Sequence, residues 1–597
     1  MNADSAFPAT AFSLHPGGQI SNVDAKFHRA LSVCRVTAHD PGHYSPRLQN
    51  ANLEHIAAVS HALGRAVQAV TESLPQRTRR ITWGVVHGKH SPDRVFDLPE
   101  HASIAGALTS FPMHIRIPAL SFAILGLVAS TLAPCWAKGS HSPPIILRDV
   151  RVIDGNGGPP LEHADILITG SKITAINAQA DGAGQPDAQA ATRNAIKPPP
   201  NTIIIKLSGK TVLPGLISNH SHLGLVKGTT VSGNNITRAN ILRQLRQYTA
   251  YGVTTVTSLG LNLKPLYDLQ PQAHSGATRT ADLFGADRGF GAPGGAPDGA
   301  PPVSMGLLEN QVYRPSTPEE ARSQVRETAQ RHPDLLKIWV DDMRGRFKAK
   351  MNPEVYKAVI DEAHANGLRV AAHVYYLEDA KQLVGDGVDI LAHGVRDKAV
   401  DSDFTQSIKG RGAWYVPTLG LDESFYIYAE HPEWLQQVFF RRSLQPSVAT
   451  QLNDPAWRAK VLADTKTVAA AKQALATNMK NVKALFDAGV NVGFGTDSGA
   501  SPLRIAGFAE HRELKLLTDA GLTPLQAIQT ATKNAATLLH LDDRGVIAPG
   551  KLADLLVVDG DPSKDISAVD NIQSVWRRGR KVADARWFKP RPPKKPA

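Results

Sequence analysis

The sequence has little cysteine, few aromatic residues and few long apolar runs. The shortage of cysteine bears most directly on the kind of chemistry that the protein can carry out. Of 597 residues only two are cysteine, Cys34 and Cys135, and both lie outside the region to which we assign the chemistry. Disulfides and thiolate catalysis are therefore excluded as the basis of function. Aromatic residues make up 6% of the chain, charged residues 20% and hydrophobic residues 42%, which is typical of a globular protein.

Acidic residues are fewer than basic ones, so the formal net charge is +12. Much of this excess lies at the C-terminus, where nine lysines and arginines follow Val575 against a single acid, Asp584. The last residues, 589–597, are rich in proline and lysine and are typical of a solvated, disordered tail. We therefore expect no nucleic-acid partner.

An apolar run extends from Ala119 to Ala133, which is shorter than the roughly 20 residues of a transmembrane helix. Together with Met113, Arg116 and small residues up to Ala137, it predicts a secretory signal peptide over 113–137. An uncleaved anchor helix or a buried core helix is the alternative. We expect a periplasmic or secreted protein without a stable membrane span after cleavage. Residues 1–112 are then an upstream, disordered extension, which N-terminal sequencing of the exported protein would test.

Strand-like segments lie near both ends of the remaining chain, and between them strand-like segments alternate with helical ones. The end segments predict one small β-domain built from both ends; they are 145–154, 164–176, 202–206, 210–213, 554–559 and 574–582. The alternation predicts a parallel sheet with crossover helices such as 353–366 and 377–385. Its strands are 252–257, 335–340, 368–373, 389–393, 414–418 and 490–495. The long span 422–488 predicts two or three helices inserted after the seventh strand.

Metal-competent side chains fall on these strands. His220 and His222 form an HxH pair, which points both rings to one side of a strand, although a surface pair is the commoner origin of this motif. Lys337 stands inside an apolar strand, where an unpaired ammonium is costly. A neutral lysine can add carbon dioxide and become a carbamate, whose two oxygens can bridge two cations. A strand-end lysine that reaches solvent is the alternative.

His373 and His393 end two other strands, and Asp497 follows a third. Each histidine alone would more often be a core or cap residue than a metal ligand. Together with His220, His222 and Lys337, however, all six map to the carboxyl ends of strands, which form the active-site face of α/β barrels. This coincidence favours a metal site.

The motifs around these residues resemble the metal-binding series of the amidohydrolase superfamily. The resemblance rests on Pro-Gly-Leu-Ile-Ser-Asn-His-Ser-His at 214–222, on the strand lysine, on the two strand-end histidines and on Gly-Thr-Asp at 495–497. It extends to 521–528, 531–536 and 545–557 and covers roughly 145–585. The sequence is most similar to the imidazolonepropionase-like and prolidase-like branch. The resemblance implies a (β/α)8 TIM barrel over 213–544 and a small β-sandwich domain formed by 138–212 and 545–588.

The resemblance also implies roles for the six residues. Two divalent metal ions would be bound, the more buried one by His220 and His222 and the more exposed one by His373 and His393. Lys337 would be carboxylated and bridge them, while Asp497 would be both a ligand of the buried metal and the catalytic acid–base. Zinc suits these ligands, and manganese, iron or cobalt are compatible with them. One position departs from the family pattern, because Ser218 stands where an aspartate is usual.

The implied activity is hydrolysis of carbon–nitrogen bonds by a hydroxide that bridges the two metals. The substrate would be a small-molecule amide or dipeptide, as in a prolidase-like dipeptidase or an N-acyl amino acid hydrolase. Tyr375 and Arg396 are candidates for contacting it; a packing tyrosine and an ion pair of Arg396 with Asp397 or another acid are the alternatives. A one-metal deaminase or imidazolone-type ring hydrolase and a catalytically inactive scaffold are the competing functions. A homo-oligomer is compatible with all of them.

Overall fold

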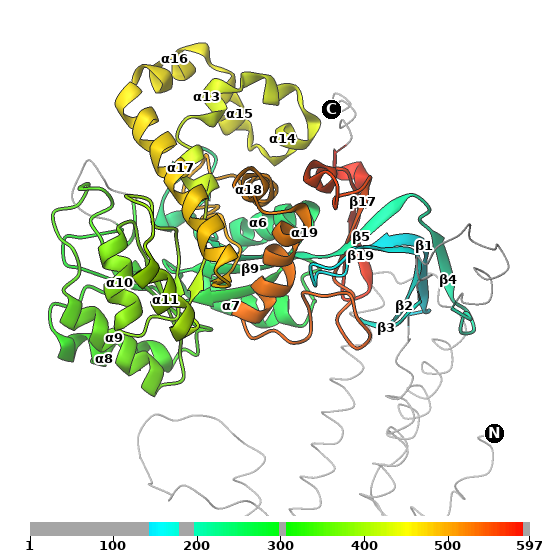
Figure 1. The fold of residues 1–597 in the computed structure, drawn as a ribbon, viewed down its shortest axis with the longest axis horizontal. Helices are drawn as coiled ribbons and strands as arrows, with labels where there is room; N and C mark the ends of the chain where they lie inside the picture. Colours follow the sequence, from blue (N-terminus) through cyan, green and yellow to red (C-terminus); the bar gives the residue numbers. More distant parts are fainter. Residues whose placement is uncertain (1–141, 178–195, 298–305, 589–597) are drawn as a thin grey trace, which may run out of the picture. The chain divides into compact units, whose positions relative to one another are not determined.

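The computed structural model describes residues 142–177, 196–297 and 306–588 (Figure 1). The described residues belong to one compact unit. The predicted extension, signal peptide and basic tail lie outside the described residues. Among the residues described, no helix is long and apolar enough to cross a membrane.

Both ends of the described chain meet in one mixed sheet, as the strand pattern predicts. Its order is β19-β18-β17-β5-β1-β2-β3, with β4 also paired to β1. Its core includes Val152, Ile166, Val212, Leu555 and Trp576. The described strands form a single sheet here, and the sandwich stays a prediction. The strands are β1 (Ile145–Val152), β2 (Leu161–Thr169), β3 (Lys172–Asn177), β4 (Ile203–Lys206), β5 (Lys210–Pro214), β17 (Leu555–Asp559), β18 (Ile572–Arg577) and β19 (Arg580–Asp584).

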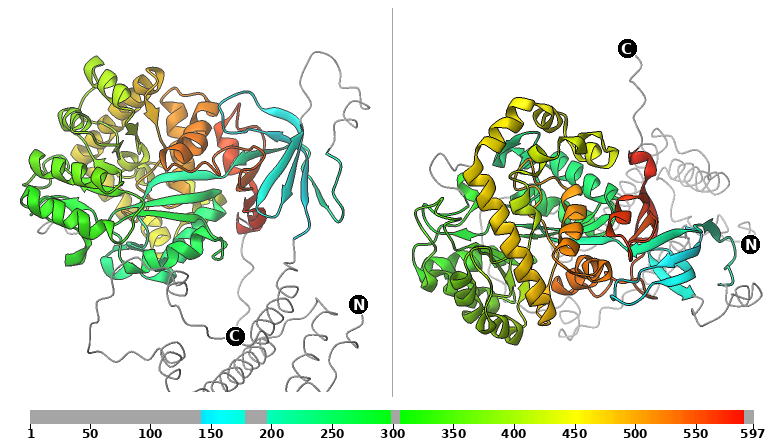
Figure 2. Two further views of the ribbon diagram at one scale, coloured as in Figure 1. Left: turned by 90° about the horizontal axis from the view of Figure 1, so that it is seen from below. Right: turned by 45° about the horizontal axis from the view of Figure 1, so that its top comes forward.

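The segment 574–582, expected as one strand-like stretch, is divided between β18 and β19. Arg578 and Gly579 have positive φ angles of 49° and 72°, so the chain turns between the two strands, which pair antiparallel. In Figure 2 these C-terminal strands lie beside the N-terminal ones, in agreement with the pairing of β17 with β5.

The rest of the described chain is a TIM-barrel-like α/β fold. Parallel strands form two sheets, β10-β9-β6 and β11-β12-β13-β14-β15-β16. Isolated parallel bridges, Ala286–Leu335 and Ser221–Ser498, connect the two sheets at both edges, although the hydrogen bonding is not one continuous closed ladder. The strands are β6 (Leu216–Ser221), β9 (Val253–Leu259), β10 (Asp282–Ala286), β11 (Phe290–Gly291), β12 (Leu336–Trp339), β13 (Val370–His373), β14 (Ile390–Leu391), β15 (Trp414–Tyr415) and β16 (Asn491–Val492).

Helices alternate with these strands, and local capping explains where several begin. Thr237, Thr317, Asn352 and Asp401 accept a backbone N–H of the first turn of α6, α8, α9 and α11. The helices are α6 (Arg238–Ala250), α7 (Lys264–His274), α8 (Pro318–Ala329), α9 (Pro353–Ala365), α10 (Leu377–Gly385), α11 (Ser402–Arg411), α18 (Phe508–Asp519), α19 (Pro524–Gln529) and α20 (Ala535–Leu538). A π-helical turn, η6 (Thr530–Asn534), joins the last two. The short strands β7 (Val226–Lys227) and β8 (Thr230–Val231) form a hairpin.

The insertion after the seventh barrel strand contains more helices than the two or three expected. Pro446 and Pro455 each stand in the first turn of a new helix, and Pro432 begins a 3₁₀ segment. Proline is tolerated at a helix start but breaks a helix interior, so these residues divide the segment into short pieces. The helices are α12 (Gly420–Glu423), α13 (Ile427–Glu430), α14 (Val438–Ser443), α15 (Pro446–Asn453), α16 (Pro455–Ala463) and α17 (Thr465–Asp487).

Candidate metal centre

His220 lies in the first barrel strand, β6, and His222 directly follows this strand; both are buried. Their ring centroids are 5.5 Å apart. Nε2 of His220 lies 3.3 Å and Nε2 of His222 lies 3.1 Å from the same carboxylate oxygen, Oδ1 of Asp497. The period of two along a strand therefore brings both imidazoles to one carboxylate, as two ligands of one ion require.

Asp497 follows the last barrel strand, β16, and has a positive φ angle of 59°. Its other oxygen, Oδ2, accepts a hydrogen bond from Arg504. Burial alone would raise the pKa of Asp497, but Arg504 and the two histidines hold it well below its usual value. The carboxylate is therefore charged at neutral pH and able to bind a cation.

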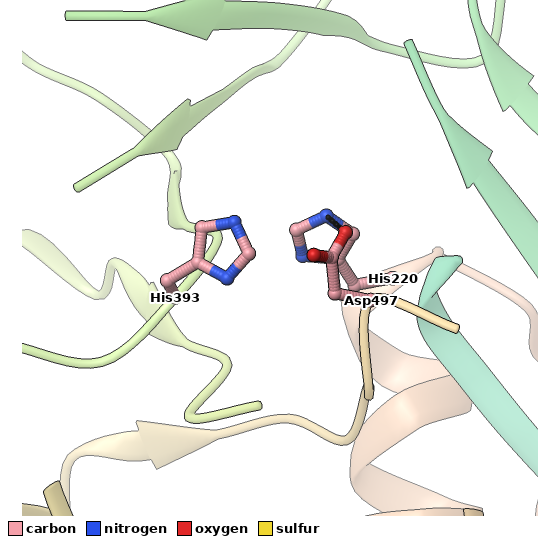
Figure 3. A group of neighbouring side chains, drawn as sticks. All are labelled: His220, His393 and Asp497. Carbon is pink, nitrogen blue, oxygen red and sulfur yellow. Dashed lines mark ion pairs between the residues drawn. The ribbon is translucent and has the colours of Figure 1, made fainter. Parts of the chain in front are cut away.

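His373 ends β13, and His393 follows β14. Their ring centroids are 4.4 Å apart, and the His393 ring lies 4.5 Å from that of His220. Figure 3 shows the His393 ring facing His220 and the Asp497 carboxylate. Nδ1 of His393 is hydrogen-bonded to the hydroxyl of Thr418 at 2.8 Å, which leaves Nε2 for a metal.

Lys337 lies on β12 with no solvent exposure, and its Nζ has no hydrogen-bond partner among the described residues. The ammonium position is 5.5 Å from the ring centroid of Trp339. Burial lowers the pKa of Lys337 to about 7, although Asp497 and Asp341 act in the opposite direction. A substantial fraction of this amine is therefore neutral near pH 7, as carbamate formation requires.

The chemistry of these donors fits a divalent cation. The side-chain donor atoms of His220, His393 and Asp497 all lie within 4.8 Å of one another. Two ligands of a tetrahedral zinc ion are about 3.3 Å apart, close to the histidine–Asp497 distances. Both ring nitrogens of His220 and of His373 are buried without a hydrogen bond among the described residues. Unsatisfied buried polar atoms are rare, and a bound cation would satisfy one nitrogen of each ring.

The protonation states support the same interpretation. Burial lowers the pKa of His220 to about 3. The pKa of His393 lies well below its ordinary value, because of burial and of the neighbouring His373 and His220. Burial also lowers the pKa of His373, against the influence of Asp341. These imidazoles are neutral at pH 7, which is the form that binds metals.

The two predicted substrate contacts lie at the edge of this group. Tyr375 is half-buried, and the guanidinium of Arg396 lies 5.1 Å from its ring centroid. Arg396 pairs with Asp422 at 3.3 Å rather than with Asp397, which instead accepts the backbone N–H of Leu377. The structure thus supplies an acid for Arg396 that is remote in sequence.

Sequence reasoning missed several residues around the six. Asp341 lies 3.5 Å from Nε2 of His373, and its place directly after the strand 335–340 was a usable signal. Arg344, Arg504 and Glu510 carry no local signal, because they stand in loops or on a helix. Ser218, the departure from the family pattern, lies with its hydroxyl 3.2 Å from the buried carboxylate of Glu510.

The structure thus brings His220, His222, Lys337, His373, His393 and Asp497 to one end of the barrel, and their role as ligands stays a prediction. Comparison with known families gives a match to the amidohydrolase family over residues 211–582. The chain belongs to this family. The predicted family is confirmed, and it is a family of metal-dependent hydrolases of carbon–nitrogen bonds.

Curated relatives match over parts of their length. An adenine deaminase of Lysinibacillus sphaericus is 50% identical over 64 residues, 11% of this chain and 10% of the relative. An uncharacterized protein of Mycobacterium tuberculosis is 28% identical over 262 residues, 43% of this chain and 60% of the relative. An imidazolonepropionase of Deinococcus deserti is 38% identical over 104 residues, 16% and 25% of the two chains. The chain thus spans at most 60% of the length of these relatives.

Solved structures with the same fold include a Xaa-Pro dipeptidase and the ochratoxinase of A. niger. The dipeptidase has a TM-score of 0.55 and 22% identity and covers 73% of this chain and 99% of its own. The ochratoxinase has a TM-score of 0.54 and 18% identity and covers 74% and 96%. These likenesses support the TIM-barrel-like fold.

Proposed function

We propose that this chain hydrolyses carbon–nitrogen bonds in small amide substrates with divalent metal bound at the six-residue centre, which comprises His220, His222, Lys337, His373, His393 and Asp497. The observation that carries the proposal is the set of buried nitrogen donors without hydrogen-bond partners around one carboxylate. Family membership and the hydrolase names of several neighbours support the same class of reaction.

A bound metal would supply the positive charge that activates water and polarises the scissile carbonyl. Asp497, whose carboxylate lies 3.3 and 3.1 Å from His220 and His222, could accept a proton from such a water and deliver it to the departing nitrogen. His220, His222, His373 and His393 would hold the metal, with Lys337 as a carbamate between two ions. The strongly lowered pKa of Asp497 keeps this carboxylate deprotonated at neutral pH.

The surroundings of the centre support a substrate with an anionic group, such as a dipeptide or an N-acyl amino acid. Arg344, Arg396 and Arg504 form what we call the arginine cluster. Arg344 and Arg396 share one carboxylate, that of Asp422, at 3.1 and 3.3 Å. Arg504 pairs with Asp497, but the negative charge of Asp497 would be neutralised by a bound metal. The cluster therefore has an excess of positive charge, and guanidinium groups bind carboxylates well.

Within the cluster Arg344 is the best placed to meet a substrate. Its side chain is 29% exposed, whereas that of Arg396 is 3% exposed. Arg344 lies 5.3 Å from the ring centroid of Tyr375 and 5.9 Å from that of Phe425. We assign the carboxylate contact to Arg344 and Tyr375, with Arg396 holding Asp422 and Tyr375 in place.

Lys337→Ala and Asp497→Asn test the metal centre. We expect both variants to fold but to lose bound metal, and kcat of the zinc- or manganese-loaded protein to fall about 100-fold or more. Metal content is measured by mass spectrometry after loading, alongside turnover of N-acyl amino acids and dipeptides. The exposed Lys264, 82% accessible, provides the control Lys264→Ala. A wild-type protein that binds no divalent metal, or that cleaves only lactones, contradicts the proposal.

Arg344→Met tests the substrate class. We expect KM for an N-acyl amino acid to rise about tenfold, since a charge-assisted hydrogen bond contributes about 1.5–3 kcal/mol. KM for the same compound with its carboxylate amidated should change little. The control is Arg586→Met, at a residue 82% exposed. Equal changes for both substrates would exclude the carboxylate contact.

A one-metal deaminase or ring hydrolase is the second candidate. It is favoured by the group His220, His393 and Asp497, whose donor atoms lie within 4.8 Å of one another. One metal per chain together with an unaffected Lys337→Ala variant would select it. Export to the periplasm or beyond also stays a proposal; the signal-like pattern at 113–137 supports it, and N-terminal sequencing tests it.

A further inference from the structure

Two buried glutamates stand one helical turn apart on α18, Glu510 and Glu513, and neither has any solvent exposure. Burying a carboxyl group is costly unless it is hydrogen-bonded, so their contacts indicate what they do. Both point to the segments that carry residues of the metal centre.

Glu510 bonds to residues on both sides of Asp497. Its Oε1 accepts hydrogen bonds from the hydroxyls of Thr496 at 2.6 Å and Ser498 at 2.8 Å. The same oxygen accepts the hydroxyl of Ser218, two residues before His220, at 3.2 Å. Glu510 therefore joins the first barrel strand, β6, to the segment 496–498, which follows the last barrel strand, β16.

Glu513 makes an equivalent arrangement at His393. Its two carboxyl oxygens accept the backbone N–H groups of Leu419 at 2.7 Å and Gly420 at 2.8 Å. These residues directly follow Thr418, whose hydroxyl is bonded to Nδ1 of His393 at 2.8 Å. Glu513 thus restrains the turn that orients His393.

The backbone explains why such restraint is needed. Asp497 and Thr418 both adopt positive φ angles, 59° and 48°, in the left-handed region that favours glycine. For a β-branched residue such as threonine this conformation is a genuine outlier. Strained conformations persist only where the surrounding structure over-determines them. Glu510 accepts hydrogen bonds from the two residues that flank Asp497, and Glu513 accepts them from the two residues that follow Thr418.

We propose that Glu510 and Glu513 are positioning residues, which hold Asp497 and His393 in the geometry that binds metal. The inference rests on the proposed function, since it concerns the same centre. Removal of a residue that supports a metal ligand typically weakens metal binding by about 10–100-fold.

The test uses Co²⁺ as the probe, because its visible spectrum reports coordination geometry in addition to affinity. We expect Glu510→Gln and Glu513→Gln to bind Co²⁺ at least about tenfold more weakly than the wild type, with altered spectra. Circular dichroism of the metal-free proteins verifies the fold. Glu423→Gln is the matched control: Glu423 is also buried and pairs with Arg512 of α18, but has no bond to the centre. Its Co²⁺ affinity should stay unchanged.

Two further pairs of variants keep the test decisive where a glutamine variant fails to fold. Thr418→Val retains the β-branched shape but removes the hydroxyl, whereas Thr418→Ser retains the hydroxyl; only the first should weaken Co²⁺ binding. Ser218→Asp combined with Glu510→Ser returns one carboxylate to the same buried position and should recover Co²⁺ affinity lost in Glu510→Ser.

The outcomes separate this inference from the proposed function. If the wild type binds no Co²⁺, the metal-dependent function itself fails. If the wild type binds Co²⁺ and folded Glu510→Gln and Glu513→Gln bind it equally well with the same spectrum, only the positioning roles are wrong. A double variant that binds no better than Glu510→Ser likewise overturns the role of Glu510.

Discussion

Glu513 shows how a single buried carboxyl group links pH to stability. Burial, with a smaller contribution from Glu423 and Glu510, raises its pKa to about 8 against two backbone hydrogen bonds that lower it. The native state therefore holds a proton that an unfolded chain releases near pH 4.5. Because the folded state binds more protons between these values, this residue makes stability fall as pH rises from about 4.5 to 8.

Glu513→Gln should remove this dependence. We expect the stability advantage of the wild type over the variant to shrink between pH 5 and pH 8, by a few kcal/mol at most, since one pKa unit corresponds to about 1.4 kcal/mol. Urea unfolding of both proteins at the two pH values measures it. A difference that grows with pH would show that the group is ionised in the native protein.

At the scale of elements, the junction of the first and last barrel strands decides the geometry of the centre. The backbone N–H of His222 donates to Ser498 at 2.7 Å, and that of Asp497 donates to His220 at 3.0 Å. Gly499 permits this approach: it has a φ of 85°, and a Cβ there would lie 2.0 Å from the carbonyl oxygen of His222. The contact is with backbone, so a side chain cannot move aside to relieve it.

Gly499→Ala should therefore separate the two strands. We expect a loss of metal affinity together with a lower thermal midpoint, because the new methyl group meets backbone and the φ angle is unfavourable for alanine. Gly410→Ala is the control, since a Cβ at Gly410 on α11 meets nothing within 4 Å. It should leave metal binding intact and stabilise the helix by about 0.5–1 kcal/mol. Wild-type metal affinity in Gly499→Ala would contradict this account of the junction.

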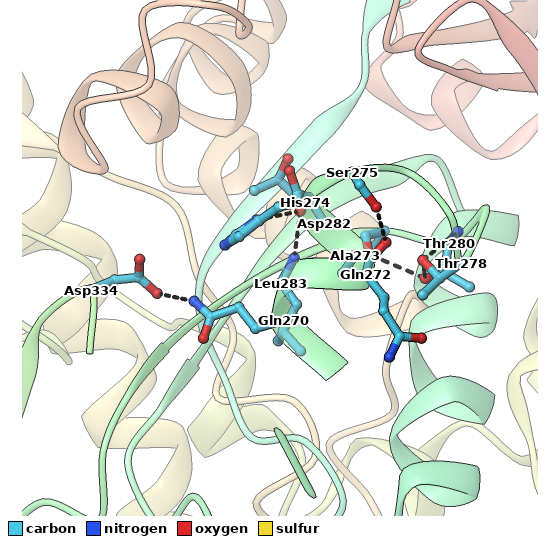
Figure 4. A network of polar contacts seen from close by, with 12 residues as sticks. Gln270, Gln272, Ala273, His274, Ser275, Thr278, Thr280, Asp282, Leu283 and Asp334 are labelled. Atoms are coloured by element: carbon cyan, nitrogen blue, oxygen red, sulfur yellow. Dashed lines mark hydrogen bonds and ion pairs between the residues drawn. The ribbon is translucent and has the colours of Figure 1, made fainter. Parts of the chain in front are cut away.

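At the scale of the whole described molecule, the barrel and the β-domain share a core. Leu556, Val558 and Val575 of the C-terminal strands belong to the same apolar cluster as the barrel strands. A buried ion network also joins them, since Asp282 at the start of β10 contacts Arg544 at 2.8 Å and Arg577 at 3.2 Å. Figure 4 shows the same aspartate beside His274 of α7. Oδ1 of Asp282 lies 2.8 Å from Nδ1 of His274.

Asp282→Asn should therefore weaken the whole fold without disturbing the metal centre. Burial alone would raise the pKa of Asp282, but His274, Arg577 and Arg544 hold it below its usual value, so the native group is charged. Its neutralisation removes a carboxylate shared by the buried Arg544 and Arg577, although Arg544 keeps its ion pair with Asp543, and we expect a cost of about 3 kcal/mol. Calorimetry should show one transition at a lower temperature, and metal bound per folded chain should stay unchanged. Two separate transitions would show that the parts unfold independently.

The local sequence pattern determined the order of the elements and the set of metal-competent residues that meet. Alternating apolar segments predicted the order of strands and helices, and strand-end positions predicted which histidines, lysine and aspartate meet, because parallel strands end at the same face. The number of helices in the insertion exceeds the two or three expected, since Pro446 and Pro455 each begin a new helix.

Only the tertiary structure decided how the centre is supported. Glu510 lies 292 residues from Ser218 along the chain, and Arg396 pairs with Asp422 instead of its neighbour Asp397. Periodicity describes which face a residue occupies within its own element, but not which distant side chain packs against that face. The ligands could be predicted because strand ends converge by rule; their glutamate and arginine neighbours could not, because packing between remote elements follows no local pattern.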